Sequence, residues 1–218
     1  MKIILSYYLK LKFYIEAHKL TIEKNSGINQ KYEFIKRNLV ISNSKFDIFF
    51  DHLITQVGEI VNDFIVIKPK RIDARKVAGI CILPMYKNKF YLMKGWRHQF
   101  NDFVYQAPTG FIEDNETLID SAKRELLEET SLICKPKNIV SLGTFLPDAG
   151  LLEASVALFL ALDCRKSPIK SSQEIGTGNL LGFKLSELKN LINNEGKIGG
   201  STLVTCFRSI NYFQNGNL

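Results

Sequence analysis

The chain is poor in the residues that crosslink a small protein or bind soft metals. Its 218 residues include only four cysteines and three histidines. Cys81, Cys134, Cys164 and Cys206 form no C-x-x-C pair, and no histidine has metal-ligand spacing to another histidine or to a cysteine. The sequence therefore argues against a disulfide scaffold and against a zinc site. We expect reduced thiols in or near a core, as in a cytoplasmic protein.

Long apolar runs, repeats and low-complexity tracts are also missing. No stretch approaches the roughly 20 apolar residues that a membrane-spanning helix requires, so no membrane partner is expected. Residues 1–9 include a short apolar run, but no small-residue cleavage site follows it, which argues against a signal peptide. The length suits one substantial domain with a small appendage.

Acidic residues are too few to balance the basic ones, and the net charge is +7. The basic excess lies before residue 110, where the lysines are scattered rather than clustered. A nucleic-acid partner is therefore not expected, because it favours a clustered basic and aromatic face. A mildly positive field suits an anionic phosphate substrate. A lysine-rich composition without any such role explains the charge equally well.

The most informative stretch is residues 110–132, G-FIEDN-E-TLIDSAK-R-E-L-L-E-E-T-S-L. Glu125, Glu128 and Glu129 are related as i, i+3 and i+4, so a helix places their carboxylates on one face. No row of lysines at i+4 positions neutralises these charges. A hard divalent cation would remove the repulsion between the carboxylates. Arg124 is placed to hold a carboxylate through two parallel hydrogen bonds. The plainer alternative is a solvated acidic helix.

With Gly110 and Glu116, the stretch resembles the Nudix box, G-x5-E-x7-R-E-U-x-E-E-x-G-U, where U is aliphatic. Every specified position matches except the last glycine, which is Ser131 here. In the family this glycine follows the helix end, where a left-handed backbone is easiest for glycine. Serine at that position is predicted to cost about 1 kcal/mol of backbone strain.

The resemblance implies a pyrophosphohydrolase that depends on Mg²⁺, or on Mn²⁺ in its place. It implies Glu125 and Glu129 as the principal metal ligands, with Glu128 sharing a second ion. Glu116 is expected as an outer ligand or as the residue that orients the start of the helix. Thr109 is expected to offer its backbone carbonyl, which the family uses as a metal ligand.

Sequences around the box resemble the ADP-ribose pyrophosphatase branch of the family. Arg97 follows a strand in G-W-R-H, the turn into the box reads A-P-T-G, and Glu113 precedes the box glutamate. A P-D-A-G turn with Glu153 just beyond it follows the helix. The resemblance covers roughly residues 36–213. By this likeness Arg97 and Glu113 are expected to bind substrate.

The catalytic groups are expected among three side chains. Arg124 is expected to orient Glu125 or Glu128. In ADP-ribose pyrophosphatases the general base lies on a loop before the strand that precedes the last helices. Glu174 is the only acid between Asp163 and Glu187, so it is the first candidate for that base. Glu153 is the second, and contact with substrate or metal suits it equally well.

The order of apolar runs predicts an α/β fold, a Nudix α/β/α sandwich built on a mixed sheet with helices on both faces. Strands are expected at residues 77–83, 90–94, 104–107, 139–145, 155–162 and 180–185. Helices are expected after a cap at Asn115 or Thr117, from a cap at Ser186 to residue 192, and at 201–213. Residues 71–218 are expected to form this domain.

Four shorter runs between residues 39 and 67 predict a small antiparallel β subdomain at residues 31–70. Residues 1–30 are interpreted as an appendage of unknown role. In related enzymes the subdomain pairs with a second chain and completes the substrate pocket, so the resemblance implies a homodimer.

The reaction implied by the resemblance is cleavage of ADP-ribose into AMP and ribose 5-phosphate. Another nucleoside diphosphate sugar, such as GDP-mannose or ADP-glucose, is the nearest alternative, because no base-reading residue is identifiable. A nucleotide-binding regulator with an inactive Nudix domain is a second alternative, against which the complete set of glutamates argues. An RNA cap or oligonucleotide hydrolase is a third.

Overall fold

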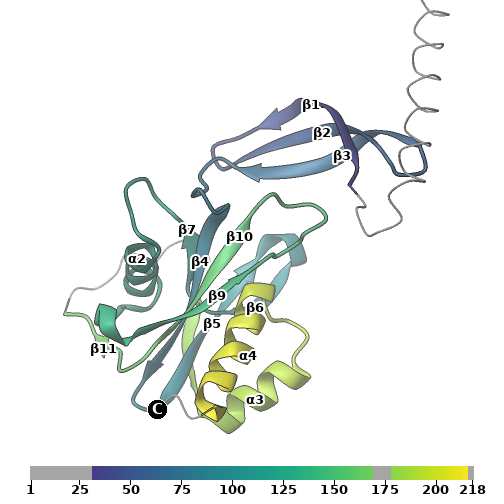
Figure 1. The fold of residues 1–218 in the computed structure, drawn as a ribbon. Coiled ribbons are helices and arrows are strands. Elements are labelled where there is room, and N and C mark those ends of the chain that lie inside the picture. The colour runs from purple at the N-terminus through teal and green to yellow at the C-terminus, as the bar shows by residue number, and fades with distance from the viewer. Residues whose placement is uncertain (1–30, 169–177, 216–218) are drawn as a thin grey trace, which may run out of the picture. The chain divides into compact units, whose positions relative to one another are not determined.

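The structure is a computed structural model that describes residues 31–168 and 178–215 (Figure 1). The chain divides into two compact units, residues 1–70 and residues 71–218. Residues 1–30 and the candidate base Glu174 lie outside the described residues. None of the described helices is long and apolar enough to cross a membrane.

The first unit contains a three-stranded antiparallel sheet in the order β1-β2-β3. Its strands are β1 (Glu33–Ser42), β2 (Phe46–Ile54) and β3 (Ile60–Pro69). The small antiparallel sheet is confirmed, although four apolar runs had suggested more breaks. Two of those runs meet in β2, where a register shift between Asp51 and Leu53 interrupts the apolar pattern. Asp51 is buried because its carboxylate accepts two hydrogen bonds from Arg37, at 2.7 and 2.8 Å.

The second unit is built on a seven-stranded mixed sheet. Five of its strands lie side by side in the order β12-β5-β4-β10-β9. Strand β6 pairs with β5 and β7 pairs with β4. Strands β4 and β10 are parallel and their other neighbours are antiparallel. A separate two-stranded ladder joins β8 to β11. The bounds are β4 (Val77–Tyr86), β5 (Lys89–Arg97), β6 (Asp102–Gln106), β7 (Thr109–Phe111), β8 (Leu132–Ile133), β9 (Ile139–Phe145), β10 (Ser155–Ala161), β11 (Arg165–Lys166) and β12 (Asn179–Phe183).

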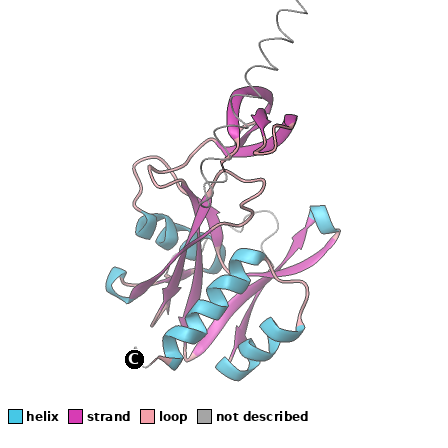
Figure 2. Cartoon of the chain, turned by 45° about the vertical axis from the view of Figure 1, so that its right-hand side comes forward, coloured by secondary structure: helices cyan, strands magenta, loops and turns pink. Residues whose placement is uncertain are grey.

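Helices cover both faces of this sheet (Figures 1 and 2). Helix α2 (Leu118–Thr130) lies on one face, and α3 (Leu185–Asn194) and α4 (Gly200–Gln214) lie on the other. Short 3₁₀ helices, η1 (His98–Phe100) and η2 (Pro136–Asn138), link strands. The predicted sandwich is therefore confirmed.

Strand β4 explains why both faces are covered. Side chains alternate across a strand. Ile80 and Ile82 belong to the apolar cluster that contains Leu126 of α2. Cys81 and Leu83 belong to the cluster that contains the apolar side chains of α3 and α4. The first eight residues of β4 are all buried, as expected of a strand between two layers.

Two boundaries differ from expectation. Residues 108–110, expected as a sharp turn, lead into the short strand β7, because Thr109 to Phe111 pair with β4. Helix α3 begins one residue before Ser186, the predicted cap, and Lys184 is its N-cap residue. The carboxylate of Glu187 accepts the Lys184 backbone N–H at 2.7 Å, so this N–H at the start of the helix has a hydrogen-bond partner.

Candidate active site

The acidic motif runs from β7 through a loop into α2. Thr117 is the N-cap residue of α2, and its hydroxyl accepts the backbone N–H of Asp120 at 3.1 Å. Of the two predicted caps, Thr117 is therefore the one used, while Asn115 has a left-handed backbone in the loop. Burial of Ala122 and Leu126 against the sheet fixes which face of α2 turns inward.

Glu125 is the most buried glutamate of the motif, and its side chain is almost fully buried. Its carboxylate occupies the space in front of Gly110. A Cβ atom added to Gly110 would lie 1.7 Å from Glu125 Oε1, far inside any contact distance. The first glycine of the motif is therefore required for space, because only glycine lets this carboxylate lie against the β7 backbone.

Arg124 binds three of the glutamates at once. It donates to both carboxylate oxygens of Glu116, at 2.9 and 3.1 Å, in a bidentate pair. It also donates to Glu125 at 2.6 Å, to Glu128 at 3.3 Å and to the Phe111 carbonyl at 3.0 Å. The guanidinium thus joins β7, the loop and α2 and fixes the carboxylates relative to the strand.

The charges of this network support one another. The hydrogen bonds from Arg124 are the main reason that the pKa of Glu116 lies below its ordinary value. Burial opposes this shift, and the Ser121 hydroxyl, which donates to Glu116 at 2.7 Å, adds to it. Burial alone would lower the pKa of Arg124, but the hydrogen bonds and charges of Glu116 and Glu125 raise it. The pair is therefore ionised on both sides near neutral pH.

Glu129 lies one helical turn beyond Glu125 and contacts β7 through Thr109. The Thr109 backbone N–H donates to Glu129 Oε2 at 3.1 Å. Residues on either side of Thr109 bond to β4: the Pro108 carbonyl accepts from Ile82 at 3.0 Å, and the Ile112 N–H donates to Ala78 at 3.1 Å. Bonded and non-bonded residues alternate in an antiparallel ladder, so the Thr109 carbonyl points away from β4.

The other described candidates make their contacts elsewhere. Arg97, exposed at the end of β5, hydrogen-bonds the buried side-chain amide of Gln106. Glu113 is exposed in the loop before α2, where its backbone carbonyl accepts the Glu116 N–H at 3.3 Å. Glu153 lies between β9 and β10 and pairs with Lys76 at 3.1 Å.

Register places Glu153 near the same end of the sheet as the motif loop. Ser155 pairs with Val77 at the start of β4, and Phe111 pairs with Gly79 two residues further along. The loop that follows Phe111 and the segment that precedes Ser155 therefore both lie at the end of the sheet where β4 begins.

The donor set of the cluster suits a hard cation. Glu125, Glu128 and Glu129 offer carboxylates, and the Thr109 carbonyl adds a neutral oxygen, the ligand types that Mg²⁺ prefers. Within residues 31–168 and 178–215, no three His, Cys, Asp or Glu side chains already form a metal-binding group. The carboxylates are instead held by Arg124 and by the β7 backbone.

Sequence reasoning missed two groups that shape this cluster, the Ser121 hydroxyl and the Phe111 carbonyl. Ser121 is fully buried and donates to Glu116, and Phe111 accepts from Arg124. Ser121 fills an unspecified position of the motif, so no spacing rule marks it. A buried polar residue needs a hydrogen-bond partner, and that is the one signal that points to it.

Comparison with known proteins agrees with this geometry. Residues 74–173 match the family model of the NUDIX domain. No curated protein matches the chain. Among 299 matching chains of solved structures, one is a crystal structure of an ADP compounds hydrolase. It superposes with a TM-score of 0.73 at 13% sequence identity, covering 88% of this chain and 100% of its own, so it shows a shared fold. The chain therefore carries a NUDIX domain at residues 74–173, which include the motif on β7 and α2.

Proposed function

We propose that this protein is a Mg²⁺-dependent hydrolase of a nucleoside diphosphate linked to a sugar, with ADP-ribose, cleaved to AMP and ribose 5-phosphate, as its preferred substrate. The observation that carries the proposal is the network in which Arg124 fixes three glutamates against β7. The sequences around the motif, which resemble ADP-ribose pyrophosphatases, support the choice of substrate. The structural likeness to an ADP compounds hydrolase is consistent with that choice.

Nudix hydrolases generally use divalent ions, and four residues of this chain are proposed to hold Mg²⁺, or Mn²⁺ in its place. Glu125 and Glu129 are the principal ligands, Glu128 shares an ion, and the Thr109 carbonyl completes the set. A bound ion supplies charge neutralisation for the diphosphate and a more acidic water. Glu116 holds Arg124, and Arg124 holds the carboxylates in place before the ion arrives.

The substrate and the base are assigned to residues outside this network. Arg97 is proposed to bind a substrate phosphate, since a guanidinium has five donors and Gln106 uses only part of that capacity. Glu113 is proposed to contact the substrate from the loop. Glu174 is the first candidate for the general base and Glu153 the second. Glu153 pairs with Lys76 at 3.1 Å.

The test is a substrate panel. The purified protein is incubated with Mg²⁺ and with ADP-ribose, ADP-glucose or GDP-mannose, and the released monophosphate is measured. ADP-ribose is expected to give the highest kcat/KM, and a chelator is expected to abolish turnover. A better GDP-mannose or ADP-glucose turnover would reassign the substrate. Binding of ADP-ribose without turnover of any compound would favour the regulator.

Two glutamine variants test the residue roles. Glu129→Gln is expected to lower kcat by about 10²–10⁴-fold, with the melting temperature preserved. Glu59→Gln, at an exposed position of the first unit, is the control and is expected to change nothing. Full activity of Glu129→Gln contradicts the ligand assignment, and full activity of Glu174→Gln moves the base role to Glu153.

The protein is proposed to be a homodimer, on the evidence of exposed apolar residues in the first unit, and to be cytoplasmic, on the evidence of its free thiols. Phe34, Leu39 and Ile41 on β1 are each more than half exposed, and a three-stranded sheet cannot bury them by itself. Light scattering should find a dimer that Leu39→Lys dissociates. Leu146→Lys, at an equally exposed site of the second unit, is the control and should stay dimeric. A wild-type monomer would contradict this part of the proposal.

A further inference from the structure

Two cysteines that are 30 positions apart in the sequence flank the paired strands β8 and β11: Cys134 directly follows β8 and Cys164 directly precedes β11. Strands β8 and β11 are antiparallel, with Leu132 paired to Lys166 and Ile133 paired to Arg165. The next position of this register places Cys134 opposite Cys164. Directly opposed residues of an antiparallel pair lie about 4.5–5.5 Å apart at Cα, within the range that a disulfide spans.

The contacts of the two sulfur atoms agree with this register. The Cys134 thiol donates to the Leu162 carbonyl at 3.1 Å, and the Cys164 thiol donates to the neighbouring Ala161 carbonyl at 3.5 Å. Both are free thiols, with Cys134 partly exposed and Cys164 buried. Cys134 is therefore the more accessible residue of the pair.

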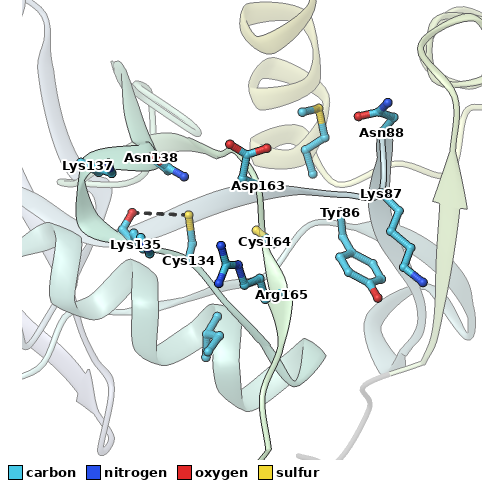
Figure 3. A pocket seen from close by; sticks show the side chains of 12 residues that line it. Tyr86, Lys87, Asn88, Cys134, Lys135, Lys137, Asn138, Asp163, Cys164 and Arg165 are labelled. Atoms are coloured by element: carbon cyan, nitrogen blue, oxygen red, sulfur yellow. Dashed lines mark hydrogen bonds between the residues drawn. The ribbon is translucent and has the colours of Figure 1, made fainter.

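The pair lines a cavity of about 660 Å³ at the end of β4 (Figure 3). No residue of the acidic motif lines this cavity, so it is distinct from the active site. Four cationic side chains and a single carboxylate, Asp163, share its wall with the thiols. The cations are Lys87, Lys135, Lys137 and Arg165. The cavity is therefore suited to a small molecule with carboxylate groups.

The two thiols differ in acidity. The neighbouring Cys164 side chain lowers the pKa of Cys134, while the Cys134 side chain and burial raise the pKa of Cys164. Burial raises the pKa of the other two cysteines, Cys81 and Cys206. Cys134 is thus the cysteine with the most thiolate character and with access to the cavity.

We propose that Cys134 and Cys164 form a thiol–disulfide exchange site for small anionic disulfides, with Cys134 as the attacking thiol and Cys164 as the resolving thiol. Cys134 thiolate attacks one sulfur of the reagent, breaks its S–S bond and releases one equivalent of the small thiol. Cys164 then attacks the Cys134 sulfur, gives its proton to solvent and releases the second equivalent. The protein loses two hydrogens and two electrons, and the reagent is reduced to two thiols.

The experiment uses the full chain and oxidised glutathione as the probe. The protein is equilibrated with an excess of the disulfide, quenched in acid, unfolded and labelled with N-ethylmaleimide. Peptide mass spectrometry is expected to find Cys134 linked to Cys164, with Cys81 and Cys206 labelled. The link is expected to raise Tm by roughly 5 °C, since it closes a loop of about 30 residues. Labelling of both Cys134 and Cys164, or a link between chains, would overturn the proposal.

Two variants test the order of attack. Cys164→Ala is expected to retain one glutathione on Cys134, because no resolving thiol remains. Cys134→Ala is expected to leave Cys164 unmodified, and equally fast modification of Cys164 would contradict the assigned roles.

A neutral probe, hydroxyethyl disulfide, tests the anionic preference of the cavity and is expected to react several-fold more slowly than oxidised glutathione. Equal rates would remove the anionic preference from the proposal. The wild-type measurement stands without the variants, and none of these readouts involves hydrolysis.

Discussion

Two groups of like charge in the same domain are held in opposite ways. In the acidic cluster, a single cation, Arg124, contacts three glutamates and a backbone carbonyl. In the basic cavity, no ion pair holds the four cations, as far as the described residues go, and Lys87 instead lies over the Tyr86 ring at 5.3 Å. The acidic side chains are therefore held by hydrogen bonds, whereas no ion pair among the described residues holds the basic ones.

This difference indicates two kinds of use. Catalysis requires groups held in place before the substrate arrives, since reorganisation during the reaction raises the barrier. A cavity that attracts a charged reagent to a thiol needs only a positive electrostatic field, which these four cations provide. Single substitutions in the acidic cluster should therefore have large effects, and single substitutions in the cavity should have small ones.

The largest effect is expected from Gly110→Ala. The added Cβ displaces the Glu125 carboxylate, whose side chain can rotate, so the fold should survive while kcat/KM falls by about 10²–10³-fold. Gly196→Ala is the matched control, because a Cβ at that position meets nothing within 4 Å. Steady-state kinetics and thermal unfolding measure both.

A double-mutant cycle sharpens this test. If Gly110→Ala acts through Glu125, its effect should not add to that of Glu125→Gln, because both remove the same interaction. Additive losses of activity would show that the glycine serves another purpose.

Arg124→Lys is expected to have the next largest effect. Lysine keeps the charge but cannot make the bidentate pair with Glu116 or span to Phe111. We expect kcat/KM to fall by about 10–100-fold and the free energy of unfolding to fall by roughly 1–3 kcal/mol. Lys123→Gln, which removes an exposed pair with Asp120, should cost less than about 0.5 kcal/mol.

The cavity is expected to respond weakly to loss of charge. Replacing Lys135 and Lys137 by glutamine should slow the reaction of Cys134 with oxidised glutathione by about 3–10-fold, with hydrolysis unchanged within about twofold. Stopped-flow measurement of thiol loss and an assay of phosphate release give the two numbers. A large loss of hydrolysis would mean that the two groups of charge are coupled.

The smallest effect is expected at Ser131, which connects α2, the helix of the acidic cluster, to β8, the strand before Cys134. It ends α2 in a left-handed backbone with φ 55°, where the family has glycine. Ser131→Gly should therefore stabilise the protein by about 1 kcal/mol, or about 3 °C in Tm. Ser186→Gly in the first turn of α3, where no left-handed backbone is involved, should destabilise it.

Features set by local sequence were predictable. The face of α2, the Thr117 cap and the left-handed residue at Ser131 each depend on neighbours within a few positions, and the structure has all three. The apolar run at residues 77–83 likewise predicted a strand, and the structure has β4 there with its first eight residues buried. Local patterns also located the glutamates that Arg124 brings together.

Features set by register were not predictable. Cys134 and Cys164 were interpreted only as core or near-core thiols, because nothing in a single sequence aligns β8 with β11. The role of Gly110 as the space for a carboxylate depends on how close α2 approaches β7. Arg97 was linked to the site by analogy, and its observed partner, Gln106, comes from the adjacent strand.

The alternation along β4 also limits how this domain can change in length. Ile80 and Ile82 serve one layer and Cys81 and Leu83 the other, so one inserted or deleted residue would exchange the two sets. Leu83 and Cys81 would then meet α2, and the isoleucines would meet α3 and α4. Length variation among descendants of this chain should therefore be confined to the connections between strands, with β4 kept free of insertions and deletions.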